Sequence, residues 1–374
     1  MNILIIAPDY PDKKRSVYTF VKQVVDHFAI QGNSCCVIAP YSITKNRSFY
    51  RLKENQNNTG SGVITILRPN YLSFSNFRIF GFSPSLYFRS LALRKALKML
   101  PFVPDIIYAH FWRSGKEIYS YAKANGIPLF IASGESQIPL SDISPTYKEF
   151  YDYVSGVICV SSKNMEESIL NGMTTKEKCI VLPNGINPQL FKLQDKAKCR
   201  ERLNLPNNAF IVAFCGALCH RKGVKVLSDA INEIEGPVYS VFMGQPMDEL
   251  PSCKHILYQG PVKHASIADY LNAADIFVLP TLHEGCCNAI IEAMACGLPV
   301  VSSNLPFNWD ILNEENSILV SPKNVEEVRL AILSLMNDKT KRSRLSNGAL
   351  NTASSLSIND RVIKIMSFVN TKLQ

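Results

Sequence analysis

The fold is decided by residues 280–303, which read PTLHEGCCNAIIEAMACGLPVVSS. A short apolar run at 276–279 precedes this stretch and another at 299–303 ends it, and each has the length of a buried strand. Residues 288–296 between them have helical composition, with Asn288 as the expected N-cap and a glycine after the last turn. A strand, a loop, a helix and a second strand in this order predict a parallel sheet.

Two carboxylates mark this segment as a binding site. Glu292 is the only charged residue between positions 289 and 301, and a carboxylate in an apolar helix is costly to bury unless a partner satisfies it. Glu284 lies in the loop after the first strand, at the end where open α/β sheets bind ligands. The start of the helix also presents unpaired N–H groups that suit phosphate. The stretch therefore predicts an anion site flanked by Glu284 and Glu292.

The bulk composition indicates a globular chain with an anionic partner. The 374 residues are enough for two domains, and 47% of them are apolar. No apolar run is long enough to span a membrane and the start lacks a basic signal-peptide region, so we expect a cytoplasmic protein. Eleven scattered cysteines indicate reduced thiols. The net charge of +9 suits nucleic acid, a nucleotide substrate or a membrane surface, and the lack of a nucleic-acid motif favours the last two.

Apolar and amphipathic segments alternate in two sets along the chain, which predicts a doubly wound α/β architecture. The first set has a helix at 16–30 and strands at 2–7, 35–39, 63–67, 105–109, 128–132 and 156–160. The second set has strands at 211–215, 238–243, 256–259, 276–279 and 299–303. Polar residues 44–62 predict a long surface loop. We expect domains at 1–185 and 186–354 and a final helix at 355–374.

The stretch at 280–303 resembles glycosyltransferase family 4, the glycosyl transferases group 1, whose members are retaining enzymes that use nucleotide sugars. The resemblance rests on Glu284 and Glu292, eight positions apart, and on the AMACGLPVV that follows at 293–301. Residues 183–185, Pro-Asn-Gly, resemble the interdomain hinge of that family. The resemblance implies a GT-B fold, in which two Rossmann-like domains face a central cleft. It places the donor in the second domain and the acceptor in the first, with the last helix returning to the first domain.

The resemblance also implies how the second domain holds the donor. Lys222, with Arg221 beside it, neutralises the charge of the diphosphate leaving group. Glu284 faces the hydroxyls of the donor sugar, and Glu292 accepts hydrogen bonds from the ribose hydroxyls. A solvated basic loop is the alternative for the two cations. The predicted donor-binding residues are Gly216, Arg221, Lys222, Glu284, Gly285, Asn288 and Glu292.

Acceptor-side candidates follow two strands of the first domain. The residues predicted to be catalytic are Glu284, Lys222 and His110. His110 follows the strand at 105–109, although a lone histidine is more often structural, and Trp112 beside it can pack on a sugar face. Ser133 and Glu135 are predicted to bind the acceptor, and Ser133 stands where the family often has a histidine. The resemblance implies no metal and no resident cofactor, since the nucleotide-diphosphate sugar is a co-substrate.

The implied function is that of a hexosyltransferase. It would move a sugar from a nucleotide-diphosphate sugar to a glycan or lipid-linked acceptor in surface polysaccharide biosynthesis. A sugar-nucleotide 2-epimerase on the same fold and a non-catalytic family member acting as a scaffold are the alternatives. Ala217 at the family's arginine position, Ser133 and a first loop at 8–15 without glycine favour the scaffold. Glu284, Lys222 and Glu292 favour an enzyme.

Two basic segments suit an anionic acceptor or a membrane. Lys13, Lys14 and Arg15 in the first loop either hold an anionic acceptor or are solvated. Residues 68–100 carry six cations, no acid and seven aromatic residues, which predicts contact with an anionic membrane surface or a lipid-linked acceptor. The protein is then cytoplasmic and peripheral on the inner face of the cell membrane. The alternative is that 85–100 is a core helix whose cations point into water.

Overall fold

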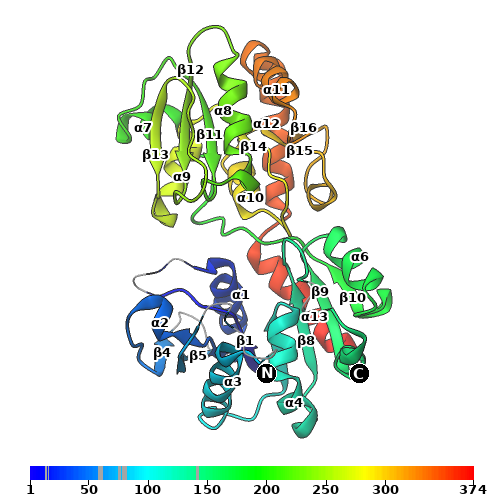
Figure 1. Ribbon diagram of the computed structural model, residues 1–374. Helices are drawn as coiled ribbons and strands as arrows, with labels where there is room; N and C mark the ends of the chain where they lie inside the picture. The colour runs from blue at the N-terminus through cyan, green and yellow to red at the C-terminus, as the bar shows by residue number, and fades with distance from the viewer. Residues whose placement is uncertain (13–14, 16, 58–61, 75–76, 78–81, 140–142) are drawn as a thin grey trace. The chain divides into compact units, whose positions relative to one another are not determined.

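The computed structural model of the chain describes residues 1–12, 15, 17–57, 62–74, 77, 82–139 and 143–374, and it divides into two compact units (Figure 1). Unit 1 comprises residues 1–160, 164–182 and 362–374, and unit 2 comprises 161–163 and 183–361. The boundary thus falls at 182/183, three residues before the expected 185/186. Of the expected final segment at 355–374, only residues 362–374 belong to unit 1.

Unit 1 is built on an eight-stranded sheet. Its strands, in spatial order, are β10 (Cys179–Val181), β9 (Val154–Cys159), β8 (Leu129–Ser133), β7 (Ile106–His110), β1 (Asn2–Ile6), β2 (Ser34–Ile38), β5 (Val63–Leu67) and β4 (Lys53–Asn57). All neighbours in this order are parallel except β4 and β5. A separate two-stranded parallel sheet is formed by β3 (Tyr41–Ser42) and β6 (Asn70–Tyr71). The helices of this unit are α1 (Thr19–Ile30), α2 (Ile43–Asn46), α3 (Pro84–Leu97), α4 (Trp112–Asn125), α5 (Lys148–Tyr153), most of α6 (Ser162–Leu170) and most of α13 (Ile358–Leu373).

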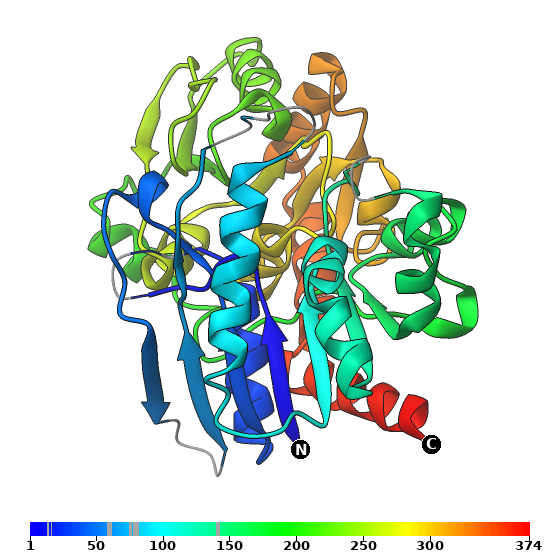
Figure 2. The ribbon, with the colours of Figure 1, turned by 60° about the horizontal axis from the view of Figure 1, so that its bottom comes forward.

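The strands of this sheet are apolar on both faces because helices cover both faces. Leu4 and Ile6 of β1 share one core cluster with Leu93 of α3 and Ile118 of α4. On the opposite face, Phe28 of α1 packs edge-on against Tyr108 of β7, with the ring centroids 5.5 Å apart. Figure 2 shows α3 and α4 beside each other over the strands, and an ion pair between Arg89 and Glu117 joins the two helices.

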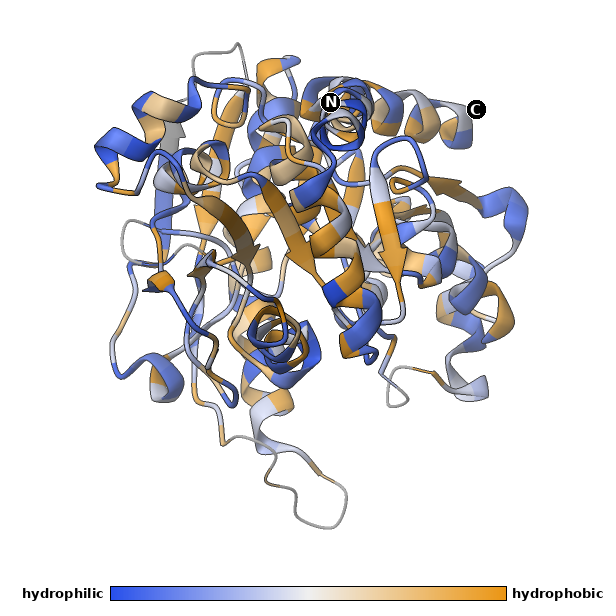
Figure 3. Cartoon of the chain, turned by 90° about the horizontal axis from the view of Figure 1, so that it is seen from above, coloured by the Kyte–Doolittle hydropathy of each residue, from blue (hydrophilic) through white to orange (hydrophobic). Residues whose placement is uncertain are grey.

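Unit 2 is a second parallel sheet with helices on both faces. Its strands, in spatial order, are β13 (Ile256–Gly260), β12 (Val238–Met243), β11 (Phe210–Cys215), β14 (Ile276–Leu279), β15 (Val300–Ser303) and β16 (Ser317–Val320). One group of packed helices comprises α8 (Val224–Asn232) and α11 (Val325–Asn337). The other comprises α7 (Lys196–Arg202), α9 (His264–Ala273), α10 (Asn288–Ala295) and α12 (Lys339–Ser354). Hydrophobic residues dominate the strands and only one side of the helices (Figure 3).

The α/β class and the parallel sheets are confirmed, and three local predictions are corrected. Residues 53–57 form the edge strand β4 rather than part of a loop, because an edge strand needs backbone pairing on one side only and tolerates polar side chains. The first helix begins at Thr19, and Ser16 lies outside the described residues. The N-cap of α10 is Cys287, not Asn288. Among the described residues, no helix has the length and apolarity that a membrane span requires.

A buried ion pair between Asp275 and Arg200 fixes the start of β11 in the second sheet. Asp275 accepts hydrogen bonds from the Ile211 backbone N–H at 2.7 Å and from the Arg200 guanidinium at 2.9 Å, and Arg200 is buried. Asp275→Asn leaves the Arg200 charge without its counterion, so we expect the free energy of unfolding to fall by about 3–5 kcal/mol. Urea titration followed by circular dichroism measures this loss. Asp269→Asn breaks a largely exposed pair with Arg202 and should cost about 0–1 kcal/mol; equal losses in the two variants would contradict the prediction.

Candidate active site

The order of strands in the second sheet brings two loops together. From β11 the chain winds outward through β12 and β13, and it then returns to place β14 on the other side of β11. Ligands of open α/β sheets bind at such a switch point, beyond the carboxyl ends of the strands. The loop after β11 carries Arg221 and Lys222 in a short 3-10 turn, and the loop after β14 carries Glu284. Residues 62 positions apart in sequence therefore meet at one site.

Glu284 joins the two loops through a single oxygen. Its Oε1 accepts from Lys222 Nζ at 2.6 Å, from Arg221 Nη1 at 2.9 Å and from Thr281 Oγ1 at 2.9 Å. The Arg221 guanidinium also donates to the backbone carbonyl of His283, in the same loop. Within the described part of the chain, Oε2 of Glu284 receives no hydrogen bond from another side chain. The carboxylate therefore holds two cations in place and keeps one oxygen available.

Burial and charge act in opposite directions on this pair. Burial acts to lower the pKa of Lys222, but the electrostatic interactions of its ammonium group with the adjacent Cys287 sulfur and with the Glu284 carboxylate outweigh burial, so the pKa is raised. Burial likewise acts to raise the pKa of Glu284, and the charges of Lys222 and Arg221 outweigh it, so the pKa is lowered. Both shifts favour the charged forms, so the site presents an ionised pair at neutral pH.

Two glycines allow the loop after β11 to pack closely. Gly216 has a φ of 152°, and a side chain there would lie 3.3 Å from the Lys222 Cε. Gly223 has a φ of 73°, and a Cβ at that position would lie 2.2 Å from the backbone carbonyl oxygen of Pro280. Only a residue without a Cβ fits between the two loops at Gly223. Gly216 thus lies beside Lys222.

The start of α10 lies beside this cluster. Lys222 Nζ is 4.0 Å from the Sγ of Cys287, the N-cap residue of this helix. Asn288 is the first helical residue, and its Oδ1 accepts from Asn184 Nδ2 at 2.8 Å. Asn184 belongs to the Pro-Asn-Gly segment that the sequence singled out. The predicted residues Gly285 and Asn288 therefore lie on the loop and helix start that follow Glu284.

Glu292 is buried, and it has a partner that the sequence analysis did not identify. His264 Nε2 lies 3.2 Å from Glu292 Oε1. His264 is the first residue of α9, and its ring packs edge-on against Phe191 at a centroid distance of 5.3 Å. The pairing joins residues 28 positions apart, so no local spacing could indicate it. The histidine accounts for one carboxylate oxygen and explains how an apolar helix tolerates a glutamate.

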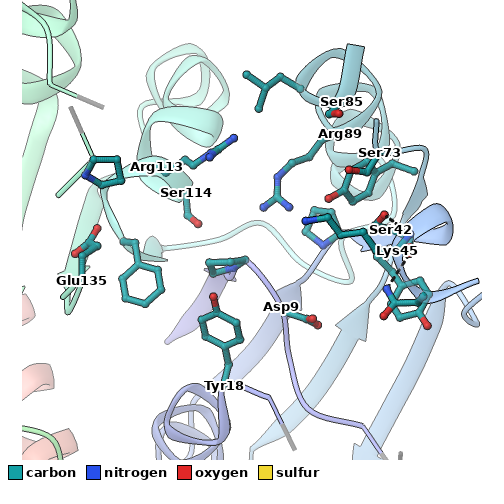
Figure 4. Close-up of a pocket in the computed structure, with 18 residues that line it drawn as sticks. Asp9, Tyr18, Ser42, Lys45, Ser73, Ser85, Arg89, Arg113, Ser114 and Glu135 are labelled. Carbon is teal, nitrogen blue, oxygen red and sulfur yellow. Dashed lines mark hydrogen bonds between the residues drawn. The ribbon is translucent and has the colours of Figure 1, made fainter. Parts of the chain in front are cut away.

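Unit 1 contains a cavity of about 750 Å³ at the switch point of its own sheet (Figure 4). The chain winds away from β1 toward β2 on one side, whereas β7 pairs with β1 on the other. Pro8 and Asp9, after β1, line the cavity together with Phe111 and Ser114, after β7. The strand order therefore generates a site in this unit by the same rule as in unit 2.

Glu135 lies at one end of this cavity. Its Oε1 accepts from the Trp112 backbone N–H at 2.8 Å, and its Oε2 accepts from the Gly134 N–H at 2.9 Å and from Ser133 Oγ at 3.2 Å. Burial raises the pKa of Glu135 to about 7, although these hydrogen bonds act to lower it. The neighbouring Phe111 has a φ of 78° and a ψ of 154°, a conformation that is rare outside glycine. Ser133 and Glu135 are thus in contact, and Glu135 faces the cavity.

His110 ends β7 and Trp112 follows it, and both had been predicted to act on the acceptor side. The Trp112 indole is only 1% exposed, donates to Ser168 Oγ at 3.2 Å and packs between Phe150 and Tyr151, so it cannot stack on a sugar. The expected stacking is wrong because the tight turn into α4 directs this side chain into the core. His110 is also buried, among aromatic rings, and is not part of the cavity lining. Its catalytic role stays a prediction.

Of the three basic residues predicted in the first loop, the structure describes Arg15. Arg15 forms ion pairs with Asp9 and Asp12, so it is not a free cation for an acceptor. Lys13 and Lys14 lie outside the described residues. Within the part of the chain that the structure describes, no three His, Cys, Asp or Glu side chains form a group suited to a metal. The predicted independence from metal stays a prediction.

Comparison with known proteins agrees with this geometry. Residues 209–338, the core of unit 2, match the family model of glycosyl transferases group 1. The chain is 30% identical over 261 residues to a putative teichuronic acid biosynthesis glycosyltransferase, TuaC, of Bacillus subtilis, and the match spans 64% of each protein. It is 28% identical over 244 residues to the Campylobacter jejuni N,N'-diacetylbacillosaminyl-diphospho-undecaprenol alpha-1,3-N-acetylgalactosaminyltransferase, covering 59% of this chain and 64% of that protein.

Solved structures extend the likeness to the whole chain. Alr3699/HepE of Anabaena, solved with UDP and glucose, aligns with a TM-score of 0.72 at 17% identity over 99% of this chain and 100% of that chain. At this identity the likeness establishes the fold alone. The fold is that of the GT-B glycosyltransferases, as the sequence predicted.

The raised pKa of Glu135 generates a prediction about stability and pH. The folded protein holds a proton on Glu135 up to about pH 7, whereas the unfolded chain loses it near 4.5, so stability falls as the pH rises through that window. Glutamine does not titrate, so Glu135→Gln lacks this pH-dependent fall in the free energy of unfolding. The free energy of unfolding of the variant, relative to the wild type, should therefore rise by on the order of 1–2 kcal/mol between about pH 5 and about pH 7.5. Denaturant titrations at several pH values measure the difference. Ser133→Ala, which keeps the carboxylate, should retain the wild-type slope, and a pH-independent difference for Glu135→Gln would rule the idea out.

Proposed function

We propose that this chain is a retaining glycosyltransferase that moves a sugar from a nucleotide-diphosphate sugar to a glycan or lipid-linked acceptor in surface polysaccharide biosynthesis. The observation that carries the proposal is the cluster of Lys222, Arg221 and Glu284 at the switch point of the second sheet, in which Lys222 is buried and Arg221 is partly exposed. This cluster lies within the segment that matches the glycosyl transferases group 1.

The two cations suit a diphosphate leaving group. When the glycosidic bond breaks, negative charge accumulates on the departing diphosphate, and preorganised cations stabilise it. Lys222 has three N–H donors and Arg221 has five, so each keeps donors for phosphate while it contacts Glu284. Because Glu284 fixes both cations in advance, little reorganisation accompanies the reaction. The N–H groups at the start of α10 add further donors beside Lys222.

Two carboxylates suit the rest of the donor. Oε2 of Glu284 is free to accept a hydrogen bond from a hydroxyl of the donor sugar. Glu292 has its second oxygen for a ribose hydroxyl, with His264 holding the first. Neither carboxylate is assigned as a covalent nucleophile. Retention of configuration is then best explained by attack of the acceptor on the face that the diphosphate leaves, with the phosphate assisting.

The relatives support the substrate classes. TuaC is named for teichuronic acid biosynthesis, and the name of the Campylobacter relative describes a transferase that acts on a sugar linked to diphospho-undecaprenol. Alr3699/HepE was solved with UDP and glucose. The donor would bind to unit 2 and the acceptor to the cavity of unit 1, through Glu135, to which the buried Ser133 hydroxyl donates from outside the cavity lining. No metal and no resident cofactor are proposed.

Two alternatives make different predictions. A sugar-nucleotide 2-epimerase would convert the donor without an acceptor, and a scaffold would bind neither nucleotide nor sugar. Nucleotide sugars of uridine, guanosine and adenosine should each be tested for an increase in the melting temperature, because a ligand of the native state raises it by mass action. The sugar nucleotide that binds is then supplied in radiolabelled form. Transfer of label to an acceptor supports the proposal, conversion without acceptor indicates an epimerase, and no binding at all indicates a scaffold.

Lys222→Ala should lower turnover about a hundredfold, the scale of losing one preorganised contact to developing charge. The affinity for the intact donor should change less, because the charge on the diphosphate develops as the bond breaks. Initial rates measured against donor concentration separate the two effects. The matched control is Lys225→Ala, an exposed lysine three residues later, on α8, which should leave the rates unchanged. A folded Lys222→Ala protein with wild-type rates would remove this residue from the site.

Glu292→Gln tests the ribose contact. If Glu292 binds ribose, the affinity for the nucleoside diphosphate should fall by about 1–3 kcal/mol, the scale of a charged hydrogen bond. Calorimetric titration and a melting curve are needed together. If the carboxylate instead serves only to pair with His264, the variant should melt at a lower temperature and bind the nucleotide normally.

We also propose that the surface around α3 contacts an anionic membrane, with fewer cations than the sequence predicted. Arg68 is buried and donates to the Tyr10 and Pro11 carbonyls at 2.7 Å, and Arg89 pairs with Glu117, so these two cations are structural. Arg78 and Phe80 lie outside the described residues. The remaining cations are exposed near the end of α3: Arg94, Lys95 and Lys98. Exposed apolar side chains lie before them, namely Phe74, Phe77, Phe82, Leu86, Tyr87 and Leu91.

Co-sedimentation with vesicles tests this surface. We expect binding to anionic vesicles that weakens with salt, because each basic residue near an anionic leaflet contributes about 1 kcal/mol. Replacing Arg94, Lys95 and Lys98 by Ser should abolish it. A control with three exposed lysines of unit 2 changed to Ser, Lys254, Lys323 and Lys339, should bind normally. Equal recovery in the supernatant with anionic and neutral vesicles would end the membrane proposal.

A further inference from the structure

The cavity of unit 1 is positively charged at one end. Lys45 of α2, Arg89 of α3 and Arg113 of α4 all line it, so three separate helices each supply a cation. Figure 4 shows the charged ends of Lys45 and Arg89 directed toward the same space, with Glu135 at the far end. Like charges repel, so a fold that gathers them around a hollow indicates a site for an anion.

Carboxylates compensate only part of this charge. Glu117 lies 2.9 Å from Arg89 Nε and 3.7 Å from Arg113 Nε, so one acid serves two arginines. Among the described residues, no carboxylate lies within ion-pair distance of Lys45. Asp9 also lines the cavity, but Arg15 holds both of its oxygens at 2.8 and 3.1 Å. Counting only the residues that the structure describes, the three cations at this end have one carboxylate, Glu117, as their counterion.

Arg89 is held in a geometry that suits phosphate. Glu117 accepts from its Nε with both oxygens, at 2.9 and 3.0 Å, and the side chain is only 14% exposed. The guanidinium also lies over the Tyr71 ring, 5.8 Å from the centroid. One edge of the planar group is thus fixed, and its terminal nitrogens point into the cavity. A planar guanidinium with two parallel N–H donors matches the oxygen pair of a phosphate.

The opposite end of the cavity combines a carboxylate, a hydroxyl and aromatic rings. Glu135 and Ser114 line it, and the Tyr18 and Phe111 rings lie 6.2 Å apart beside them. A hydrogen-bonding carboxylate beside aromatic rings suits a sugar, which has both hydroxyls and an apolar face. The cavity thus has a sugar end and an anion end, and a single elongated ligand would span both.

We infer that the unit 1 cavity binds an acceptor with a phosphate or diphosphate on its sugar, and that Lys45, Arg89 and Arg113 hold that anion. This inference rests on the proposed transferase function and adds the charge of the acceptor to it. The sugar that receives the transferred group lies toward Glu135. The phosphate belongs either to a lipid diphosphate or to a soluble sugar phosphate. Leu86, at the start of α3, lines the cavity with its side chain partly exposed, which gives a lipid chain a path from the anion end onto that helix.

Calorimetry with inorganic pyrophosphate tests the anion site. Because the cations of unit 2 also attract pyrophosphate, all titrations use full-length protein that carries Lys222→Ala. We expect Lys45→Ala combined with Arg113→Ala to weaken the remaining binding at least about tenfold. Both residues are exposed, so this variant should fold, whereas Arg89→Ala leaves Glu117 without its main partner. The control combines Lys123→Ala on α4 with Lys148→Ala on α5, which removes the same charge from the same unit and should leave the affinity unchanged. Equal weakening in both double variants would overturn the inference.

Further ligands distinguish the two sources of phosphate. Farnesyl diphosphate that binds more tightly than pyrophosphate indicates a lipid-linked acceptor, whereas glucose 1-phosphate that binds as tightly indicates a soluble one. Free glucose that binds as well as glucose 1-phosphate would overturn the inference. Nucleotide binding to the otherwise wild-type protein should be the same with and without Lys45→Ala and Arg113→Ala. A protein that binds pyrophosphate in this cavity but no nucleotide sugar would refute the proposed function and leave the anion site standing.

Discussion

The contact between Lys222 and Glu284 is the constraint on which the candidate site of unit 2 depends. The two side chains come from loops that follow different strands, and they meet because β11 and β14 are neighbours at the switch point. A buried charge is tolerated only with a close counterion, so neither loop can move away alone. Three donors converge on one oxygen of Glu284, Oε1. Structure and chemistry thus depend on the same carboxylate.

Both units follow one architectural rule with different local chemistry. In each, the carboxyl ends of two central strands diverge and leave space for a ligand. In unit 2 that space holds an ion pair and a helix start. In unit 1 it is a larger cavity with cations at one end and Glu135 at the other. The same fold thereby provides one site suited to a leaving group and another suited to a substrate that spans two environments.

The sequence predicted the central strands well because they are buried on both faces and read as continuous apolar runs. It missed β4, whose polar residues give no such signal. The resemblance located Lys222 and Glu284, but no spacing could indicate that His264 pairs with Glu292 or that Phe111 adopts a positive φ. The stacking role given to Trp112 was wrong because a side chain's direction after a strand depends on a turn that sequence does not specify.

The division of the chain bears on how the protein forms during synthesis. Unit 2 is almost entirely the continuous segment 183–361, whereas unit 1 is completed by residues 362–374 of α13. Phe368 of that helix packs closely on Gly156 of β9, where a Cβ would come within 2.8 Å of its ring. On the ribosome, the earlier segments of unit 1 are therefore completed only after the segment 183–361 of unit 2 has been made. Unit 2 can reach its native packing while β9 is still uncovered, and a chain stalled before residue 362 would expose that apolar strand to chaperones.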